Sequence, residues 1–234
     1  MGTRGWVASA LVGLALVAMS LGWDRQAHGQ QDQGGMQQRA PVEQMAVFVH
    51  GFHVGACDTA MQEPAYHYCN PVRPDFIQCF VYDGDGAGAN LIGVEHIVSR
   101  DIFMGLPPEE QVLWHAHNYE VKSGMLTAPG LSDTDELALM TGLITTFGKT
   151  WHVWHPGMQE HPLGSASLMK AFTADGQIRP ELIAERDAKF GVDVEQLKAK
   201  RAGIPDPGAP TITVGAPVAA FPGCDVDNLG APFQ

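Results

Sequence analysis

Residues 46–54 read AVFVHGFHV, and this stretch opens the part of the chain whose pattern decides the fold class. β-branched and aromatic residues dominate it, as they do three later stretches: AYHYC at 65–69, FIQCFVYD at 76–83 and LIGVEHIVS at 91–99. Such residues suit the pleated, half-buried surface of a sheet. Segments rich in Gly, Pro and Asp separate the four stretches and favour turns. The sequence therefore predicts four consecutive strands from Met45 onward.

The pattern changes after Arg100, where helical signals become frequent. The segment 101–114 is typical of a short helix interrupted before Pro107 and followed by a second helical turn. Strand alternation returns in HAHNYEVKSGML, and a strand is also expected in KTWHVWH. Further helices are expected from Asp133, as a capping residue, to Gly148, and at 179–191 and 193–203. Because strands come first and no βαβ rhythm is present, we predict one α+β domain with an antiparallel or mixed sheet and helices mainly in the C-terminal half.

Composition divides the chain into four parts. Residues 1–29 combine Arg4, an apolar run of 18 residues and the small-x-small site Ala27-His28-Gly29, which is the order of a secretory signal peptide. The alternative is an uncleaved anchor, since the run is near the length that spans a bilayer. We expect a disordered lead-in at 30–44, the α+β domain at 45–204, and a Gly/Pro-rich tail at 205–234. The mature protein is thus expected to be exported, to the periplasm or the medium, with no transmembrane segment.

Net charge excludes one class of partner. Removal of residues 1–29 takes away Arg4, Arg25 and Asp24 and leaves 12 basic and 25 acidic residues, a net charge of −13 with neutral histidines. Such a surface repels phosphate backbones, so nucleic acid is not an expected partner.

Several linked motifs resemble the oil body-associated protein family, which is known from plants and also has bacterial and fungal members. They run in order from Val47 to Ala202: FHV (52–54), YHYC (66–69), FIQC (76–79), LIGVE (91–95), LWHAHNYEVKSGML (113–126), FGKTWHVW (147–154), FTADGQ (172–177) and ERDAKFGVD (185–193). The resemblance implies association with lipid droplets for plant members and no established activity or cofactor. The signal peptide, the tail with Cys224, and Cys57 depart from the family pattern and indicate an exported, bacterial-type member.

The motif His115-x-His117 is the strongest candidate for a metal site. On an extended strand the two imidazoles, together with Tyr119, point to the same face, whereas Glu120 points to the other. His152, which lies in another family-like motif, is expected as the third ligand, with His155 as the alternative, so that zinc, copper or iron could be bound. His67-x-Cys69 is a second pair on one face. We treat His50, His53, His96 and His161 as ordinary surface or core residues.

Two other interpretations of His115-x-His117 stay open. Histidines in strands often pack against aromatic rings and bond to backbone carbonyls, and four Trp and Tyr side chains are close in sequence. A cupin barrel also uses His-x-His followed by Glu, but here the glutamate is one residue closer than usual and the second cupin motif is missing.

The four cysteines lie in the expected mature chain, where an oxidising compartment favours disulfides. Cys69 and Cys79 fall in the family-like region and flank a nine-residue turn, so we pair them; Cys57 and Cys224 then form the second pair. The alternative is that Cys69 and Cys79 are thiolate ligands that join the histidines.

These observations lead to two functional hypotheses. The first is a non-enzymatic domain that binds a small-molecule or lipid ligand. The second is a metal-binding protein or metal-dependent enzyme that uses the His-x-His segment.

Overall fold

Four consecutive strands form an antiparallel meander at the start of the domain, as the strand composition predicts. The structure, a computed structural model, describes residues 40–208. The strands are β1 (Val47–Gly55), β2 (Gln62–Arg73), β3 (Phe76–Tyr82) and β4 (Leu91–Ser99). Strand β2 is longer than expected, because NPVR, expected as a turn, continues the pairing with β3 as far as a bulge near Arg73.

The meander closes into a six-stranded barrel through two later strands. Strand β6 (Thr146–His152) pairs with β4, and β7 (Ser167–Lys170) joins β6 to β1. The short strand β5 (His115–Ala116) adds to β6 beside β7. Each of these pairings is antiparallel, so the expected α+β domain contains an antiparallel sheet that closes on itself. Closure removes the exposed edges that an open sheet would leave.

One end of the barrel interior is apolar and is covered by helices. Helix α5 (Asn118–Lys122) and helix α6 (Asp133–Leu143) supply side chains that pack against inward-facing residues of the meander. This cluster includes Val49, Cys69, Cys79, Ile97, Val121, Leu139, Met140 and Leu143. The inward positions at the other end are polar, and they form the candidate site.

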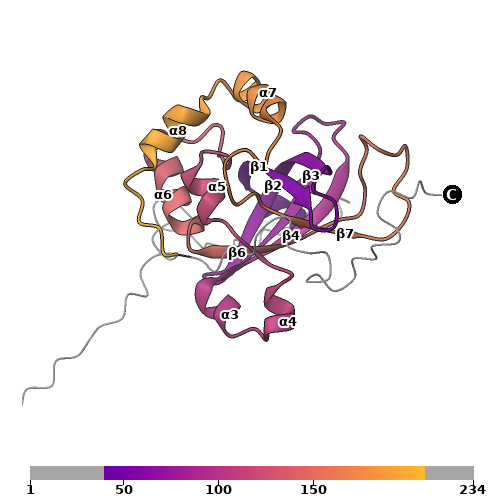
Figure 1. Cartoon of the computed structure of the whole chain (residues 1–234), viewed down its shortest axis with the longest axis horizontal. Coiled ribbons are helices and arrows are strands. Elements are labelled where there is room, and N and C mark those ends of the chain that lie inside the picture. The colour runs from indigo at the N-terminus through magenta and orange to yellow at the C-terminus, as the bar shows by residue number, and fades with distance from the viewer. Residues whose placement is uncertain (1–39, 209–234) are drawn as a thin grey trace, which may run out of the picture.

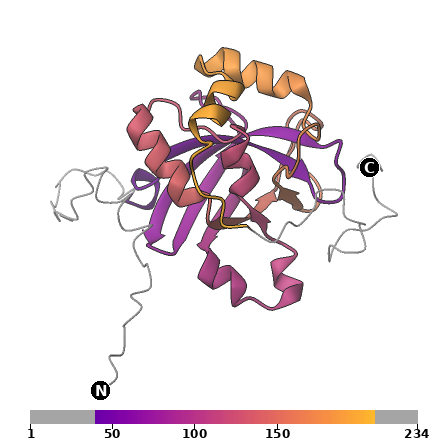
Figure 2. The same ribbon diagram turned by 60° about the vertical axis from the view of Figure 1, so that its left-hand side comes forward.

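The remaining helices cover the outside of the barrel. Helices α3 (Arg100–Met104) and α4 (Pro108–Gln111) lie on one side, and α7 (Pro180–Phe190) and α8 (Val194–Lys200) lie on the opposite side (Figures 1 and 2). On the first side Phe103 stacks on Phe147 with ring centroids 3.8 Å apart. On the second side Phe190 contacts the rings of Phe48 and His50.

Two elements differ from the sequence expectations. The expected strand HAHNYEVKSGML is wrong beyond Ala116, because α5 begins at Asn118 and the backbone N–H of Val121 bonds to the carbonyl of His117. Strand β5 pairs with β6 only at His115 and Ala116, so no ladder supports a longer strand. Helix α6 is capped by Ser132, rather than Asp133, and ends at Leu143, well before the expected Gly148, because the chain pairs with β4 from Thr146 onward.

The disulfide expected between Cys69 and Cys79 is present. The two residues are direct partners in the β2–β3 register, and their Cα atoms are 4.0 Å apart. For the expected pair of Cys57 and Cys224, Cys224 lies outside the described residues. The same is true of the expected signal peptide at 1–29 and of most of the expected tail.

The end of the expected lead-in carries some structure, since helix α2 (Ala40–Glu43) precedes β1. Within residues 40–208, no helix combines the length and the apolar character needed to cross a membrane.

Candidate metal centre

A buried glutamate, Glu95, lies at the centre of the polar part of the barrel. Its side chain is 3% exposed, and four histidine Nε2 atoms surround it. His67 and His53 lie 2.8 Å and 3.6 Å from Oε2, and His117 and His115 lie 3.2 Å and 3.4 Å from Oε1. Each carboxylate oxygen therefore faces one pair of imidazoles.

Strand register explains how the four histidines converge. Direct partners on antiparallel strands share a face, and alternate residues along a strand share it too. His67 on β2 pairs with Val49 on β1. Gly51 and His53 follow Val49 by two and four residues, so they lie on the same inward face. Glu95 pairs with Cys79 on β3 and with Thr150 on β6, so the same face continues round the barrel.

The other two histidines come from the short strand β5 and its end. His115 pairs with Gly148 on β6, and His117 is the residue that precedes α5. The ammonium group of Lys170 fixes the approach to β5 by donating to the carbonyls of Val112 and Trp114, at 2.5 Å and 2.8 Å. Burial lowers the pKa of Lys170 to about 7.

Gly148 provides the space in which three of the donor atoms meet. A Cβ atom at this position would collide with Glu95 Oε1 and would lie 2.7 Å from His115 Nε2 and 2.8 Å from His117 Nε2. A larger residue would therefore force at least one of these three buried side chains to move. The three donor atoms therefore point at a small volume that the backbone leaves open.

The electrostatics of the cluster favour an ionised Glu95 and uncharged imidazoles at His53 and His115. Burial by itself would raise the pKa of Glu95, but contacts with the four histidines outweigh it and hold the pKa well below its usual value. Burial lowers the pKa of His53 to about 3 and that of His115 to about 4, although Glu95 opposes both shifts. Neutral imidazoles keep a nitrogen lone pair, which is the form that binds metals.

Several ring nitrogens in this cluster have no ordinary hydrogen-bond partner. Among the described residues, no hydrogen-bond partner is found for Nδ1 or Nε2 of His67 or for Nδ1 of His115. The 2.8 Å separation of His67 Nε2 from Glu95 is short, but its direction is not that of a hydrogen bond. Buried polar atoms normally have hydrogen-bond partners, so these unpaired nitrogens indicate that the cluster binds a further partner.

A second polar group lies beside the first, at the same end of the barrel. Glu63 Oε2 lies 2.9 Å from Nδ1 of His152 and 2.9 Å from Nδ1 of His155. His152 Nε2 in turn lies 2.9 Å from Nδ1 of His53, which links the two groups. The three expected ligands are thus divided: His115 and His117 meet at Glu95, and His152 contacts Glu63 instead.

Helix α5 also changes the position of Glu120. The side chain was expected on the face opposite to the His-x-His pair, but it is 4% exposed and points into the barrel toward Gly51. Burial and the charge of Glu95 raise the pKa of Glu120 well above its usual value. Tyr119, expected beside the histidines, instead packs on the apolar cluster around Phe52 and bonds to Asp175.

The sequence interpretation missed Glu95, His53 and Glu63 as members of these groups. For Glu95 and His53 the available signal was the alternation itself, since each is a polar residue at a position that an inward-facing strand residue would occupy. Glu63 precedes the expected strand at 65–69, because β2 begins earlier than expected, at Gln62. His53 was treated as ordinary, and Glu95 was quoted only within a motif. The possible thiolate role of Cys69 and Cys79 is not supported, because their sulfur atoms are bonded to each other.

Comparison with known proteins identifies relatives over the whole described domain. A family model described as "Protein of unknown function (DUF1264)" matches residues 39–205. Oil body-associated protein 2A of Zea mays is 42% identical over 175 residues, which cover 74% of this chain and 69% of the relative. Oil body-associated protein 1B of Arabidopsis thaliana is 41% identical over 173 residues, which cover 74% and 72%. No solved structure matches significantly.

The matched region contains every strand of the barrel, both polar groups and the helices that cover them. The resemblance drawn from the sequence motifs is thereby confirmed. The chain belongs to the family of unknown function DUF1264, which includes the oil body-associated proteins.

Proposed function

We propose that this protein binds a transition-metal ion inside the barrel, at Glu95 and the surrounding histidines. The observation that carries the proposal is the convergence of four buried Nε2 atoms on the two oxygens of one buried carboxylate. Ligands bound to a zinc ion at about 2.0–2.1 Å lie about 3.3 Å from one another in a tetrahedron. The nitrogen–oxygen distances of 2.8–3.6 Å agree with that spacing.

The tautomer of His117 supports this assignment. Thr146 Oγ1 donates its only proton to the carbonyl of Leu143 at 2.7 Å, so it can only accept from His117 Nδ1, also at 2.7 Å. If its imidazole is uncharged, His117 then carries a lone pair on Nε2, which faces Oε1 of Glu95 at 3.2 Å. Two acceptors face each other across this gap, and a cation between them would satisfy both.

The ligand set selects the class of metal. Imidazole nitrogen with one carboxylate suits zinc, iron and copper, whereas calcium and magnesium prefer oxygen ligands. The disulfide removes the nearby thiolates, so the ion would be held by His and carboxylate alone. The donor atoms form two sets within 4.8 Å, His53–His67–Glu95 and Glu95–His115–His117, which share the glutamate.

Elemental analysis tests the proposal. We expect near-stoichiometric zinc, iron or copper in the purified protein, and its loss in Glu95→Gln and in the double variant His115→Ala/His117→Ala. His161→Ala is the matched control, because this exposed side chain bonds only to the carbonyl of Glu160. Wild-type protein that contains no metal and takes up none of these ions on titration would overturn the proposal.

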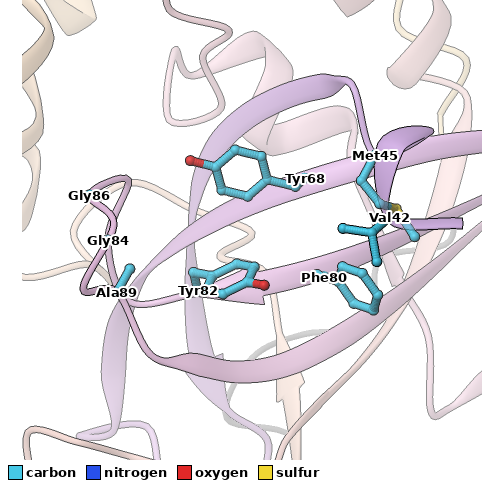
Figure 3. A pocket seen from close by; sticks show the side chains of 8 residues that line it. All are labelled: Val42, Met45, Tyr68, Phe80, Tyr82, Gly84, Gly86 and Ala89. Carbon is cyan, nitrogen blue, oxygen red and sulfur yellow. The ribbon is translucent and has the colours of Figure 1, made fainter. Parts of the chain in front are cut away.

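A second candidate function, binding of a small apolar or lipidic ligand, is favoured by a cavity on the outer face of the barrel. The cavity has a volume of about 220 Å³ and is walled by Tyr68, Phe80 and Tyr82 from β2 and β3, with Val42 and Met45 at one end (Figure 3). This volume is below the usual range for drug-sized ligands and fits a short apolar group, such as the end of an acyl chain. The names of the plant relatives associate those proteins with oil bodies.

Binding of a fluorescent fatty acid would test this second function. Phe80→Ala/Tyr82→Ala should weaken the binding, whereas Val153→Ala, which truncates an exposed apolar side chain elsewhere, should not. Equal binding by both variants would contradict it.

We also propose that the chain is exported after removal of residues 1–29. The Cys69–Cys79 disulfide supports this location, because disulfides persist in oxidising compartments. Intact-mass analysis of protein from the native host should give a chain that begins near Gln30. Peptide mapping without reduction tests the accompanying pair of Cys57 and Cys224.

A further inference from the structure

Two hydrogen bonds connect three side chains, from Glu63 in the wall of a surface cavity to His53, which faces the buried carboxylate of Glu95. Glu63 Oε2 lies 2.9 Å from His152 Nδ1, and His152 Nε2 lies 2.9 Å from His53 Nδ1. His53 Nε2 then faces Glu95 Oε2 at 3.6 Å. The side chains of His53 and His152 are at most 2% exposed, whereas that of Glu63 is 15% exposed.

The order of protons along this chain is fixed by Glu63. Oε2 of Glu63 lies 2.9 Å from Nδ1 of both His152 and His155, and a carboxylate oxygen in such contacts accepts both hydrogen bonds. His152 must therefore donate from Nδ1, and in its uncharged form its Nε2 is an acceptor. His53 must in turn donate from Nδ1, which leaves a lone pair on Nε2 directed toward Glu95.

We propose that Glu63 is a positioning residue, which acts through His152 to hold His53 in the tautomer that can bind a metal at Glu95. This inference rests on the proposed metal-binding function. Histidine ligands commonly donate their second ring N–H to a carboxylate or carbonyl, and loss of such partners typically weakens metal binding about 10–100-fold. Here the carboxylate is one imidazole further from the ligand than in the usual arrangement.

The surroundings of Glu63 hold its carboxylate in place and leave it accessible from the surface. His155 donates to the same oxygen from Nδ1, and its Nε2 lies 3.1 Å from Ser167 Oγ, so Glu63 is held from two sides. Glu63 also lines a cavity of about 550 Å³ together with Asp58, Asp83 and Arg179. The carboxylate that sets the tautomer is therefore reached from the surface, whereas the nitrogen that it controls is buried.

Glu63, His152 and His155 also have the composition of a metal site, with one donor atom from each within 4.8 Å. An ion there would replace the Nδ1 protons on which the tautomer argument depends. Both ring nitrogens of His152 and of His155 have hydrogen-bond partners, unlike those of His67. This difference favours the positioning role over a second ion.

Metal affinity and histidine tautomers together test the proposal. Competition with a chromophoric chelator should show about 10–100-fold weaker zinc binding in Glu63→Ala. Glu63→Gln should fall between this variant and wild type, because its amide oxygen still accepts a hydrogen bond. Asp58→Asn is the control, since Asp58 lines the same cavity but accepts from the backbone N–H of Ala60.

Long-range ¹H–¹⁵N spectra of the metal-free protein give a readout that a merely structural role would not change. His53 and His152 should both be protonated on Nδ1 in wild type and in Asp58→Asn, and this pattern should be lost in Glu63→Ala. Unchanged affinity and tautomers in Glu63→Ala, or an ion that Glu95→Gln retains and Glu63→Ala loses, would overturn the role of Glu63. Failure of wild type to bind any ion would instead refute the metal proposal. The spectra would then still report the tautomers of His53 and His152.

Discussion

Substitution of Gly148 by alanine should abolish metal binding without removing a single donor group. The added methyl would lie 2.7 Å and 2.8 Å from the Nε2 atoms of His115 and His117, and closer still to Glu95 Oε1. An ordinary contact begins at 3.4 Å, so the two imidazoles must move by about 0.7 Å and 0.6 Å. Metal–ligand distances tolerate about 0.2 Å, which makes these displacements several times too large.

The same substitution should also destabilise the fold. Overpacking of a well-packed interior costs about 1–3 kcal/mol, and here the clash involves Glu95 on β4, His115 on β5 and His117, which precedes α5. Metal content by mass spectrometry and the free energy of unfolding in urea measure the two effects separately. Gly86→Ala is the control, because a Cβ atom there meets nothing within 4 Å.

A Gly148→Ala protein with a full complement of metal would refute the reasoning, since the ion could not then depend on Glu95 Oε1 and its two histidines. If the variant does not fold, Glu95→Gln tests the same centre with almost no change in volume. Loss of metal from Glu95→Gln with a retained fold is the expected result.

Three further predictions concern stability. Replacement of Cys69 and Cys79 by alanine should lower the free energy of unfolding by about 2.5–3 kcal/mol, as measured in denaturant, because the bridge closes a loop with a sequence separation of 10. Arg201→Met should cost about 3–5 kcal/mol in the same assay, since it removes the buried ion-pair partner of Glu136 and leaves only Lys200, at 3.5 Å, beside that carboxylate. A smaller loss in the double variant with Glu136→Leu would identify the poorly compensated charge as the cause. In chelator-treated protein, Glu120→Gln should stabilise the fold more at about pH 8 than at about pH 4, because a raised pKa gives stability that is complete below the unfolded-state pKa and is lost as pH rises. A gain that does not depend on pH would contradict the buried, protonated state of Glu120.

The sequence by itself determined the local elements of the first half. Residues 91–99 were expected as a strand and form β4 with the same bounds, because β-branched residues and the flanking turns are local signals. The pair of Cys69 and Cys79 was also accessible, since a short turn between neighbouring strands fixes which residues face each other. Likewise, the family motifs are read directly from residue order and spacing.

Closure of the barrel was decided by tertiary structure alone. Pairing of β4 with β6 joins residues about fifty positions apart, and β7 returns to β1 over more than a hundred. No propensity of either strand specifies that contact, which depends on the twist of the sheet and on burial of both faces. An open sheet and a barrel therefore had the same sequence pattern.

The composition of the metal centre depends on that closure. His115 and His117 were identified because only one residue separates them in the sequence. The expected cause of their proximity, a strand that continues to Tyr119, was wrong, because α5 begins at Asn118. Glu95, His53 and His67 each come from a different strand, and their side chains meet only because β1, β2 and β4 curve round one interior. Local pattern determines which face of a strand a side chain occupies, whereas long-range pairing determines which other side chains share that space.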